Sequence, residues 1–392
     1  MARVDVVIFH QPPRDDDAPL VRVLAEARHR LVQHQVELFE RAGAGRVRIV
    51  PGRVPGSSGV GDAAMAADAR VAGATDARVA VTDSFGGHLA QLVGEQRLRR
   101  LVVFGSGAVP LLSLSDARRL VAAAGSPGRV ALTNNRYSSD ICAMSDASPL
   151  LDLPALPSDN PLPRWLEERA GFAVSELPAR DRLAFDLDTP QDVALLALVR
   201  GTPRAVRSVA AEADLTVPRL GELRALARDP RRELLIFGRS GSATLRWLER
   251  NVRCRVRFLA EERGLRASSP LAIGDMPPSE PSGRPVHTRP PRATLGRLLA
   301  DHGPGALASI VAELADGAII DSRVLMADRF GSDEDAWPAP VDRFASDLLR
   351  PDDVTDPWLR DLTASAASAS IPILLGAHTL VGPGVSIVLG SP

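Results

Sequence analysis

Short apolar segments alternate with longer helical patterns through the first half of the chain, and this alternation limits the folds open to it. The apolar segments have the length and flanking turn residues of strands, and they cover residues 4–9, 45–52, 76–83, 100–107, 129–135 and 172–177. The helical patterns cover residues 18–43, 86–97, 115–125 and 164–171. Such alternation predicts an α/β fold in which helices cover a mostly parallel sheet and ligands bind at the carboxyl ends of its strands.

A second series of strands and helices follows the first. At 392 residues the chain exceeds one ordinary core of about 150 residues. Further strand and helix patterns lie in residues 233–264, 305–326 and 370–381. The Pro-rich stretch 268–292 is expected to be an exposed loop. We therefore predict two domains, residues 1–200 and a smaller α/β domain at residues 201–392 that resembles no family we recognise.

The basic residues limit the chemistry of the chain. All 47 of them are arginine, because the sequence contains no lysine. A Walker A lysine and a lysine nucleophile or base are therefore excluded, and a phosphate must be held by arginine, backbone amides or a metal. The net charge of −1 gives no overall attraction to nucleic acid, so none is expected as a partner. The two cysteines, Cys142 and Cys254, have no CxxC partner and indicate neither a zinc site nor a disulfide framework.

The sequence also gives an expectation for the cellular location of the protein. No stretch approaches the ~20 apolar residues of a membrane span. The N-terminus enters the first predicted strand without the apolar region and cleavage site of a signal peptide. These features predict a cytoplasmic protein with no membrane partner.

The stretch AFDLDTPQDVALL, residues 184–196, ends an apolar run with two carboxylates one residue apart. In a strand, Asp186 and Asp188 would project on the same side at the carboxyl end, which is a place to hold a cation. The Thr-Pro that follows is expected to start a helix, with Asp192 completing the capping box of Thr189. A capped strand–helix turn with solvated acids explains the same residues, so this stretch alone leaves both interpretations open.

Several motifs within residues 1–200 resemble the MobA-like group of nucleotidyltransferases, and particularly phospholactate guanylyltransferase. The most specific is RLAFDLDTPQDVALL, which resembles the closing strand and DIDTPEDL motif of that family. RLVVFGSGAVPLL resembles its central strand and DLPLL turn, and FGGHLAQLV resembles the helix start that approaches the nucleotide. ALTNNRYSSDICAM occupies the place of its nucleotide or substrate loop.

This resemblance implies a nucleotide-diphospho-sugar transferase type of α/β domain. The implied reaction joins a nucleoside monophosphate from a nucleoside triphosphate to a phosphorylated small-molecule acceptor, and the subgroup implies GTP. Mg²⁺ is the implied cofactor, with Asp186 and Asp188 as its ligands. Transfer at an α-phosphorus requires charge neutralisation and alignment of the attacking and leaving oxygens, which a metal provides.

Two positions depart from the family pattern. The second metal-binding aspartate of the family falls on Ala108. The glycine-rich loop after the first strand is replaced by HQPPRDDDAP, in which Arg14 is the only basic residue and Asp15–Asp17 would repel a triphosphate. The alternative is therefore a noncatalytic nucleotide-binding or assembly protein with a degenerate transferase fold.

Further nucleotide contacts are expected at a helix start, at a strand end and in the loop after the first strand. These candidates are Gly86, Gly87, Thr133, Asn134, Asn135 and Arg14. Glycines before a helix let backbone amides approach a phosphate or a base, and polar groups at a strand end lie where the sheet rule places a ligand. A plain turn before a helix and ordinary Asn-Asn turn chemistry explain the same residues.

The second domain contains a candidate anion-binding turn, FGRSGSAT, between an apolar strand and a helix. Arg239 would supply charge, and the hydroxyl groups within residues 240–244 would supply donors. Glu261 and Glu262 follow the next strand, where a ribose-binding acid stands in a dinucleotide fold, although the full G-x-G-x-x-G pattern is missing.

Three other residues of the second domain carry chemistry. Asp321 and Arg323 are expected on one face of a strand, where they would form an internal ion pair. His378 follows an apolar strand and is expected to be structural. A separate enzyme activity around Arg239, Glu261 and His378 is the remaining alternative for this domain.

Overall fold

The computed structural model describes residues 3–51, 84–154, 156, 158–178, 180–261, 291–331 and 333–390. Contacts divide the chain into two compact units. The N-terminal unit comprises Met1–Asp17, Arg22–Asp188 and Gly201–Val209, and the C-terminal unit comprises Ala18–Val21, Thr189–Arg200 and Ala210–Pro392. The strand predicted at 76–83 and nearly all of the loop predicted at 268–292 lie outside the described residues.

The N-terminal unit contains a six-stranded sheet with the order β2-β1-β3-β5-β4-β6 among its described residues. Its strands are β1 (Asp5–His10), β2 (Arg46–Pro51), β3 (Leu101–Gly105), β4 (Val130–Thr133), β5 (Ile141–Met144) and β6 (Ala173–Glu176). Neighbouring strands are parallel except that β5 runs antiparallel to β3 and β4. The helices are α1 (Pro19–Arg41), α2 (Phe85–Gln96), α3 (Leu114–Gly125), η1 (Ser148–Asp152), α4 (Leu162–Glu168), α5 (Arg180–Leu183) and α7 (Arg204–Glu212).

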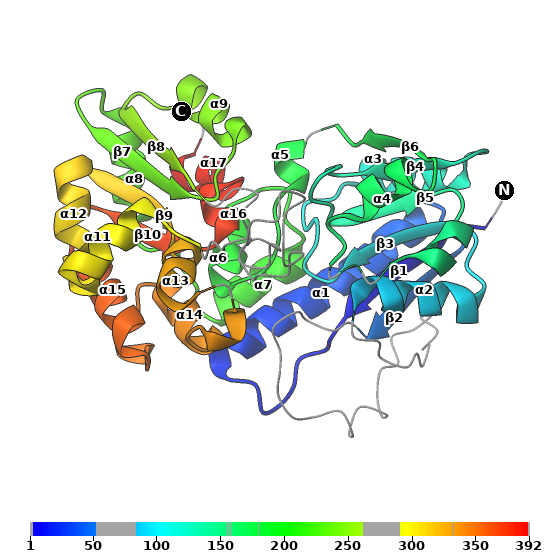
Figure 1. Ribbon diagram of the computed structural model, residues 1–392, viewed down its shortest axis with the longest axis horizontal. Helices are drawn as coiled ribbons and strands as arrows, with labels where there is room; N and C mark the ends of the chain where they lie inside the picture. The colour runs from blue at the N-terminus through cyan, green and yellow to red at the C-terminus, as the bar shows by residue number, and fades with distance from the viewer. Residues whose placement is uncertain are drawn as a thin grey trace, which may run out of the picture. The chain divides into compact units, whose positions relative to one another are not determined.

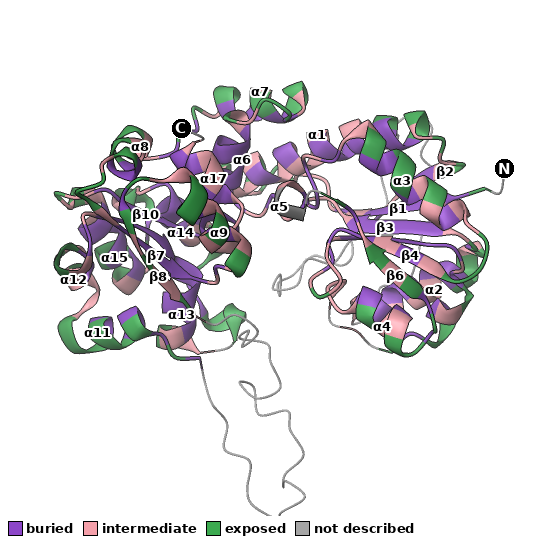
Figure 2. Cartoon of the chain, turned by 90° about the horizontal axis from the view of Figure 1, so that it is seen from above, coloured by how far each residue is buried: buried purple, intermediate pink, exposed green. Residues whose placement is uncertain are grey.

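Helices cover both faces of this sheet (Figure 1). Helices α1 and α3 lie on one face, and α2 and α4 lie on the other (Figure 2). Alternate residues of β1 point to opposite faces, so Ile8 packs with Phe39 of α1 and Leu120 of α3, whereas Val7 packs with Leu89 of α2. The two apolar layers hold the strand ends of the sheet in place.

Strand β5 departs from the sequence prediction, which has a loop in this region. All four of its residues are buried. A strand that is covered on both faces is uniformly apolar, so it has no alternating pattern that would reveal it. The sheet is therefore mixed, with one antiparallel strand among its described members.

Residue 184 lies in a turn, and residues 185–188 belong to no helix or strand, although buried and partly exposed side chains alternate along them. The prediction of a closing strand is therefore wrong. Helix α5 comes immediately before this segment, and the backbone is linked to the turn after β3 by a hydrogen bond from Leu187 N to Gly107 O at 2.9 Å. A single such bond does not make a ladder, because a strand needs a series of them.

The C-terminal unit contains a four-stranded, fully parallel sheet with the order β10-β9-β7-β8 among its described residues. Its strands are β7 (Glu233–Gly238), β8 (Arg255–Ala260), β9 (Gly317–Asp321) and β10 (Ile373–Gly376). Strand β7 lies between β8 and β9. From β7 the chain adds β8 toward one edge of the sheet, and it then adds β9 and β10 toward the other edge. Open α/β sheets bind ligands at such a switch point, outside the carboxyl ends of the strands.

The helices of this unit also form two layers. They are α6 (Pro190–Ala197), α8 (Leu220–Arg228), α9 (Ser242–Asn251), α11 (Thr294–His302), η2 (Pro304–Ala306), α12 (Leu307–Leu314), α13 (Ser322–Phe330), η3 (Glu334–Ala336), α14 (Pro340–Asp347), η4 (Pro351–Asp353), α15 (Pro357–Ser368), α16 (His378–Val381) and α17 (Gly384–Leu389). Helices α11 and α12 lie across the sheet from α8 and α17 (Figure 2). Leu299, Val311 and Leu362 pack from one layer against Phe237 and Ile320 of the sheet. Both units are therefore α/β, as the sequence predicts.

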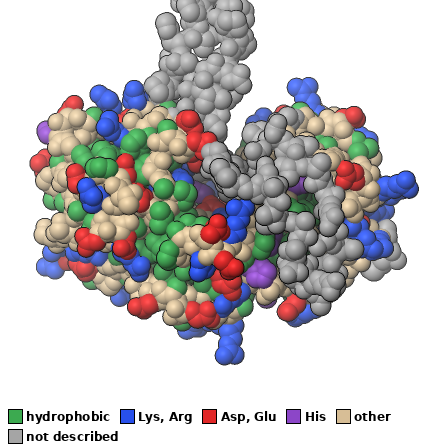
Figure 3. All heavy atoms as spheres, turned by 90° about the horizontal axis from the view of Figure 1, so that it is seen from below, with side chains coloured by type: hydrophobic (Ala, Val, Ile, Leu, Met, Phe, Trp, Pro, Cys, Tyr) green, Lys and Arg blue, Asp and Glu red, His purple; other side chains and the backbone are tan. Residues whose placement is uncertain are grey.

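The surface carries charges of both signs. Basic and acidic side chains are interspersed on the face drawn in Figure 3, in agreement with the net charge of −1. Among the helices that the structure describes, none is both long enough and apolar enough to cross a membrane.

Candidate functional site

The helix start predicted at Thr189 is confirmed. The Thr189 hydroxyl oxygen accepts a hydrogen bond from Asp192 N at 3.2 Å, and the Asp192 carboxylate accepts one from Thr189 N at 2.8 Å. Pro190 begins α6, at a position where no backbone donor is needed. This capping box fixes the direction in which the backbone leaves Asp188.

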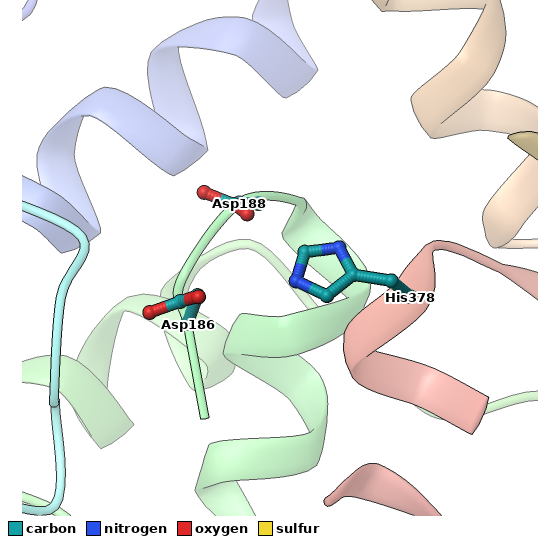
Figure 4. A group of neighbouring side chains, drawn as sticks. All are labelled: Asp186, Asp188 and His378. Atoms are coloured by element: carbon teal, nitrogen blue, oxygen red, sulfur yellow. The ribbon is translucent and has the colours of Figure 1, made fainter. Parts of the chain in front are cut away.

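Asp186 and Asp188 lie on the extended segment that leads into α6 (Figure 4). Phe185 and Leu187, which alternate with them, are 1% and 0% exposed, so the two carboxylates share the opposite side of the backbone. Carboxylate oxygens of the two residues lie within 4.8 Å of each other. The structure thus brings the two candidate metal ligands together, although they do not lie on a strand.

Arg28 of α1 positions this segment. Its Nη2 donates to Asp188 Oδ1 at 2.8 Å, and its Nε donates to Leu187 O at 2.7 Å. The side chains of Arg28 and Asp188 are 22% and 42% exposed. Solvent screens an ion pair of this exposure, so Arg28 orients the carboxylate without enclosing it.

The turn after β3 lies beside the acidic segment. A Cβ at Gly107 would come within 2.8 Å of Leu187 O, so only glycine allows this approach. Ala108 is 7% exposed and belongs to an apolar cluster, and its carbonyl accepts a hydrogen bond from Gln35 Nε2 at 2.9 Å. Val109 has a φ of 45°, which is unusual for a β-branched residue. Ala108 therefore lies where the resemblance requires an aspartate, but its side chain is part of the core.

His10, which the sequence leaves unassigned, ends β1 at the same edge of the sheet. It is 5% exposed, its Nε2 lies 3.1 Å from His29 Nδ1, and His29 Nε2 lies 3.0 Å from Gln33 Nε2. Burial, together with the charges of His29 and Arg28, lowers the pKa of His10 from 6.5 to about 4. The ring is therefore neutral at pH 7, and it supplies no positive charge at the end of β1.

The backbone donors of Gly86 and Gly87 are already used within the N-terminal unit. Gly86 N donates to Leu156 O at 3.0 Å, and Gly87 N donates to the Ser84 hydroxyl at 3.1 Å. A Cβ at Gly86 would lie 2.1 Å from Pro154 O. Gly86 therefore allows α2 to pack closely on Pro154 and Leu156, and nucleotide contacts at Gly86 and Gly87 stay a prediction.

The polar side chains at the end of β4 form an internal network. The Thr133 hydroxyl lies 2.9 Å from the Ser139 hydroxyl, and Asn134 Nδ2 donates to Asp140 Oδ2 at 2.6 Å. Asn135 Oδ1 accepts a hydrogen bond from Tyr137 N at 3.0 Å. Thr133 and Asn134 are almost fully buried, so the network holds the connection between β4 and β5. Nucleotide contacts at these residues stay a prediction.

Arg14 lies in a short turn after β1. Arg14 N donates to Asp17 Oδ2 at 2.9 Å, and Asp17 N donates to Arg14 O at 3.3 Å. Arg22 Nη2 also donates to Asp17 O at 3.0 Å, which ties the turn to α1. The Arg14 guanidinium is exposed and makes no hydrogen bond to the residues that the structure describes.

In the C-terminal unit, an ion pair lies at the switch point of the sheet, at the carboxyl ends of β7 and β9. Arg239 follows β7 and donates from Nε and Nη2 to the two carboxylate oxygens of Asp321, at 2.6 and 3.1 Å. Gly238 has a φ of 122°, and a Cβ there would lie 2.3 Å from Asp321 Cβ. Burial alone would raise the pKa of Asp321, but Arg239 holds it below its usual value. The predicted anion-binding charge is thus neutralised within the unit.

Arg323 does not pair with Asp321 as the sequence predicts. Strand β9 ends at Asp321, and Arg323 lies in the first turn of α13. Its Nη1 and Nη2 donate to the two carboxylate oxygens of Asp347, at 2.8 and 2.6 Å, and both residues are buried. Burial opposes the charge of Arg323, but Asp347 raises the pKa of the guanidinium above its usual value. Asp347 is 24 positions away, so spacing along the chain gives no signal for the pair.

The other candidates of the C-terminal unit are held by their neighbours. The Ser240 hydroxyl donates to Val381 O, and Thr244 Oγ1 donates to Gly382 O at 3.3 Å. Glu261 Oε2 accepts a hydrogen bond from Thr294 N at 2.8 Å, and Glu262 lies outside the described residues. His378 begins α16 and is partly exposed (Figure 4).

Two comparisons with known proteins complete these observations. Neither the protein-family models nor the curated proteins contain a match to this chain.

Proposed function

We propose that the N-terminal unit is a Mg²⁺-dependent nucleotidyltransferase. The observation that carries the proposal is the pair of carboxylates, Asp186 and Asp188, whose oxygens lie within 4.8 Å of each other on one side of an extended segment. Mg²⁺ prefers oxygen ligands at about 2.1 Å and is typically bound by one or two carboxylates together with substrate phosphates. The donor set therefore fits this metal after a small approach of the two side chains.

In the proposed reaction, an oxygen of the acceptor phosphate attacks the α-phosphorus of a nucleoside triphosphate. The bond to the β-phosphate breaks, and pyrophosphate leaves with the electron pair. Bound Mg²⁺ would neutralise the phosphate charge and align the attacking and leaving oxygens. Asp186 and Asp188 would hold the metal, and Arg28 orients Asp188 through its 2.8 Å hydrogen bond. GTP and a phosphorylated small molecule are the substrates that the resemblance of the DLDTPQD segment favours.

A noncatalytic nucleotide-binding protein is the second candidate, and three observations favour it. Ala108 is part of the apolar core, so one expected metal ligand is replaced. The amides of Gly86 and Gly87 already have acceptors within the unit. The imidazole of His10 is neutral at pH 7. These features weaken the contacts that a triphosphate needs for transfer, whereas they leave the two carboxylates in place.

Calorimetric titration with GTP, ATP, CTP and UTP, with and without Mg²⁺, tests the metal site. We expect metal-dependent binding to the intact protein that weakens at least tenfold in Asp186→Asn and Asp188→Asn. Asp152→Asn is the matched control, because Asp152 is an exposed aspartate of η1 in the same unit. Equal binding by all four proteins, or no binding at all, would remove the proposed site.

Release of pyrophosphate separates the two candidates. Incubation of the nucleotide that binds with phospholactate or another phosphorylated acid should release pyrophosphate if the unit is a transferase. Binding without release, whatever acceptor is added, would leave the noncatalytic protein as the better account.

A further inference from the structure

Three arginines and two buried aspartates lie around the carboxyl ends of β7, β9 and β10 in the C-terminal unit. Arg239 neutralises Asp321, and Arg323 neutralises Asp347, each through two hydrogen bonds. Arg343 is the third arginine. It belongs to α14, whose C-terminal end carries Asp347. The network therefore contains one more positive charge than the two aspartates balance.

Arg343 has no partner of its own among the residues that the structure describes. Its guanidinium makes no hydrogen bond or ion pair with them, and its Nε is buried. Its guanidinium carbon lies 6.0 Å from the centre of the Trp337 ring, which supports the side chain from one side. The residue as a whole is only partly buried, so its Nη groups are the part that a ligand can reach.

The groups that face Arg343 do not neutralise it. Burial and the charge of Arg323 lower the pKa of Arg343 to about 10, and Glu334 and Asp347 oppose this shift only in part. Glu334 is exposed, so water screens its charge. Asp342, the preceding residue, instead accepts hydrogen bonds from Thr355 and from Asp356 N. Arg343 is still a cation at pH 7, and its burial is unfavourable without an anion.

We propose that Arg343 is the anchoring residue of an anion-binding site in the C-terminal unit, which takes a small ligand that carries a phosphate or carboxylate group. A guanidinium binds two oxygens of such a group through parallel hydrogen bonds. The charges of Arg323 and Asp347 act on Arg343, and α14, which carries Arg343, packs against β10. The carboxyl ends of β9 and β10 lie where α/β sheets bind ligands. This site is independent of the nucleotide site in the N-terminal unit.

The first test measures how anions change the melting temperature of the full chain. Inorganic phosphate and acetate, each in the ~10 mM range, are the probes, because a ligand that binds only the folded state stabilises it. Phosphate also stabilises proteins without binding them, so variants are needed. Arg343→Met removes the charge but keeps the length of the side chain. Arg360→Met is the control, because Arg360 is an exposed arginine of α15 in the same unit.

We expect phosphate, acetate or both to raise the melting temperature of the wild type and of Arg360→Met by a few degrees more than that of Arg343→Met. A response to phosphate alone identifies a phosphate-type ligand, and a response to acetate alone identifies a carboxylate. Without added anion, Arg343→Met should melt at the same temperature as the wild type or higher, because an unbalanced charge is removed. A purely structural arginine would instead make the variant less stable.

A second measurement needs no substitution. The buried Nε–H of Arg343 should exchange slowly with solvent and give a separate resonance in NMR spectra of arginine-labelled protein. Titration with the anion that stabilises the protein should shift this resonance until it saturates. Identical responses of wild type and Arg343→Met to both anions, or an Nε–H resonance that neither anion shifts, would overturn the proposal.

Discussion

The carboxyl edges of the two sheets both gather charged residues, but they hold them differently. In the N-terminal unit, Asp188 is 42% exposed and shares one hydrogen bond with Arg28. In the C-terminal unit, Asp321 and Asp347 are fully buried, and each is bound through both oxygens by an arginine. At the carboxyl edge of the N-terminal sheet the carboxylate is therefore accessible to solvent, whereas at the same edge of the C-terminal sheet the carboxylates are buried in ion pairs with arginines.

This difference separates binding from stability. A buried ion pair leaves an uncompensated charge in the interior when one partner is removed, whereas an exposed pair is screened by water. The paired residues of the C-terminal unit, Asp321 and Asp347 with their arginines, should therefore affect stability strongly. Residues of the acidic segment in the N-terminal unit should affect ligand binding more than stability.

The largest effect is expected for Asp347→Asn. Arg323 would keep its charge in a buried place without a counterion, so the free energy of unfolding should fall by about 3–5 kcal/mol. Urea unfolding of the variant and the wild type measures this loss. Asp361→Asn, at an exposed position of α15, should change stability by less than about 0.5 kcal/mol. A loss below about 1 kcal/mol for Asp347→Asn would mean that water compensates the charge of Arg323.

The next largest effect is expected for the pH dependence of stability, and it comes from the buried, neutral His10. The folded pKa of about 4 lies below the ordinary value of 6.5, so the unfolded chain binds the proton more readily between these two values. The contribution of the neutral His10 to stability is therefore fully present above pH 6.5 and is lost as the pH falls toward 4. Between pH 7 and pH 4.5 the wild type should lose on the order of 2–3 kcal/mol more than His10→Gln.

Urea unfolding across this pH range is the measurement, and His302→Gln is the control. His302 is exposed at the end of α11, so its replacement should leave the slope unchanged. Parallel curves for the wild type and His10→Gln would show that the imidazole takes up a proton in the folded state without penalty. In that case the edge of the N-terminal sheet could carry positive charge, and the contrast with the C-terminal unit would weaken.

Sequence reasoning predicts the parts of this fold that local patterns encode. The capping box of Thr189 and Asp192 is recognisable because all its atoms come from four consecutive residues. Strand β5 has no such signal, because a strand that is buried on both faces loses its alternation. The segment at 184–188 alternates like a strand but lacks a neighbouring ladder, and alternation alone does not distinguish these two cases.

The candidate site is predictable only in part, for a similar reason. Asp186 and Asp188 are close in sequence, so their proximity follows from the backbone. The pairs Arg239–Asp321 and Arg323–Asp347 join residues that are 82 and 24 positions apart, and only the topology of the sheet brings them together. Gly86 shows the converse, since its sequence context suits a phosphate, whereas its amide is bound to Leu156 O.

The smallest effect on stability, and the sharpest test of the contrast, is expected at Asp188. In a double-mutant cycle, Arg28→Met and Asp188→Asn should couple by less than about 1 kcal/mol, because the pair is partly exposed. The same cycle with Arg323→Met and Asp347→Asn should give a coupling several times larger, since that pair is buried. A coupling energy between Arg28 and Asp188 as large as that of the buried pair would show that Asp188 mainly stabilises the fold of its unit. The acidic segment would then be held by its arginine, as the aspartates of the C-terminal unit are, and would no longer favour a cation.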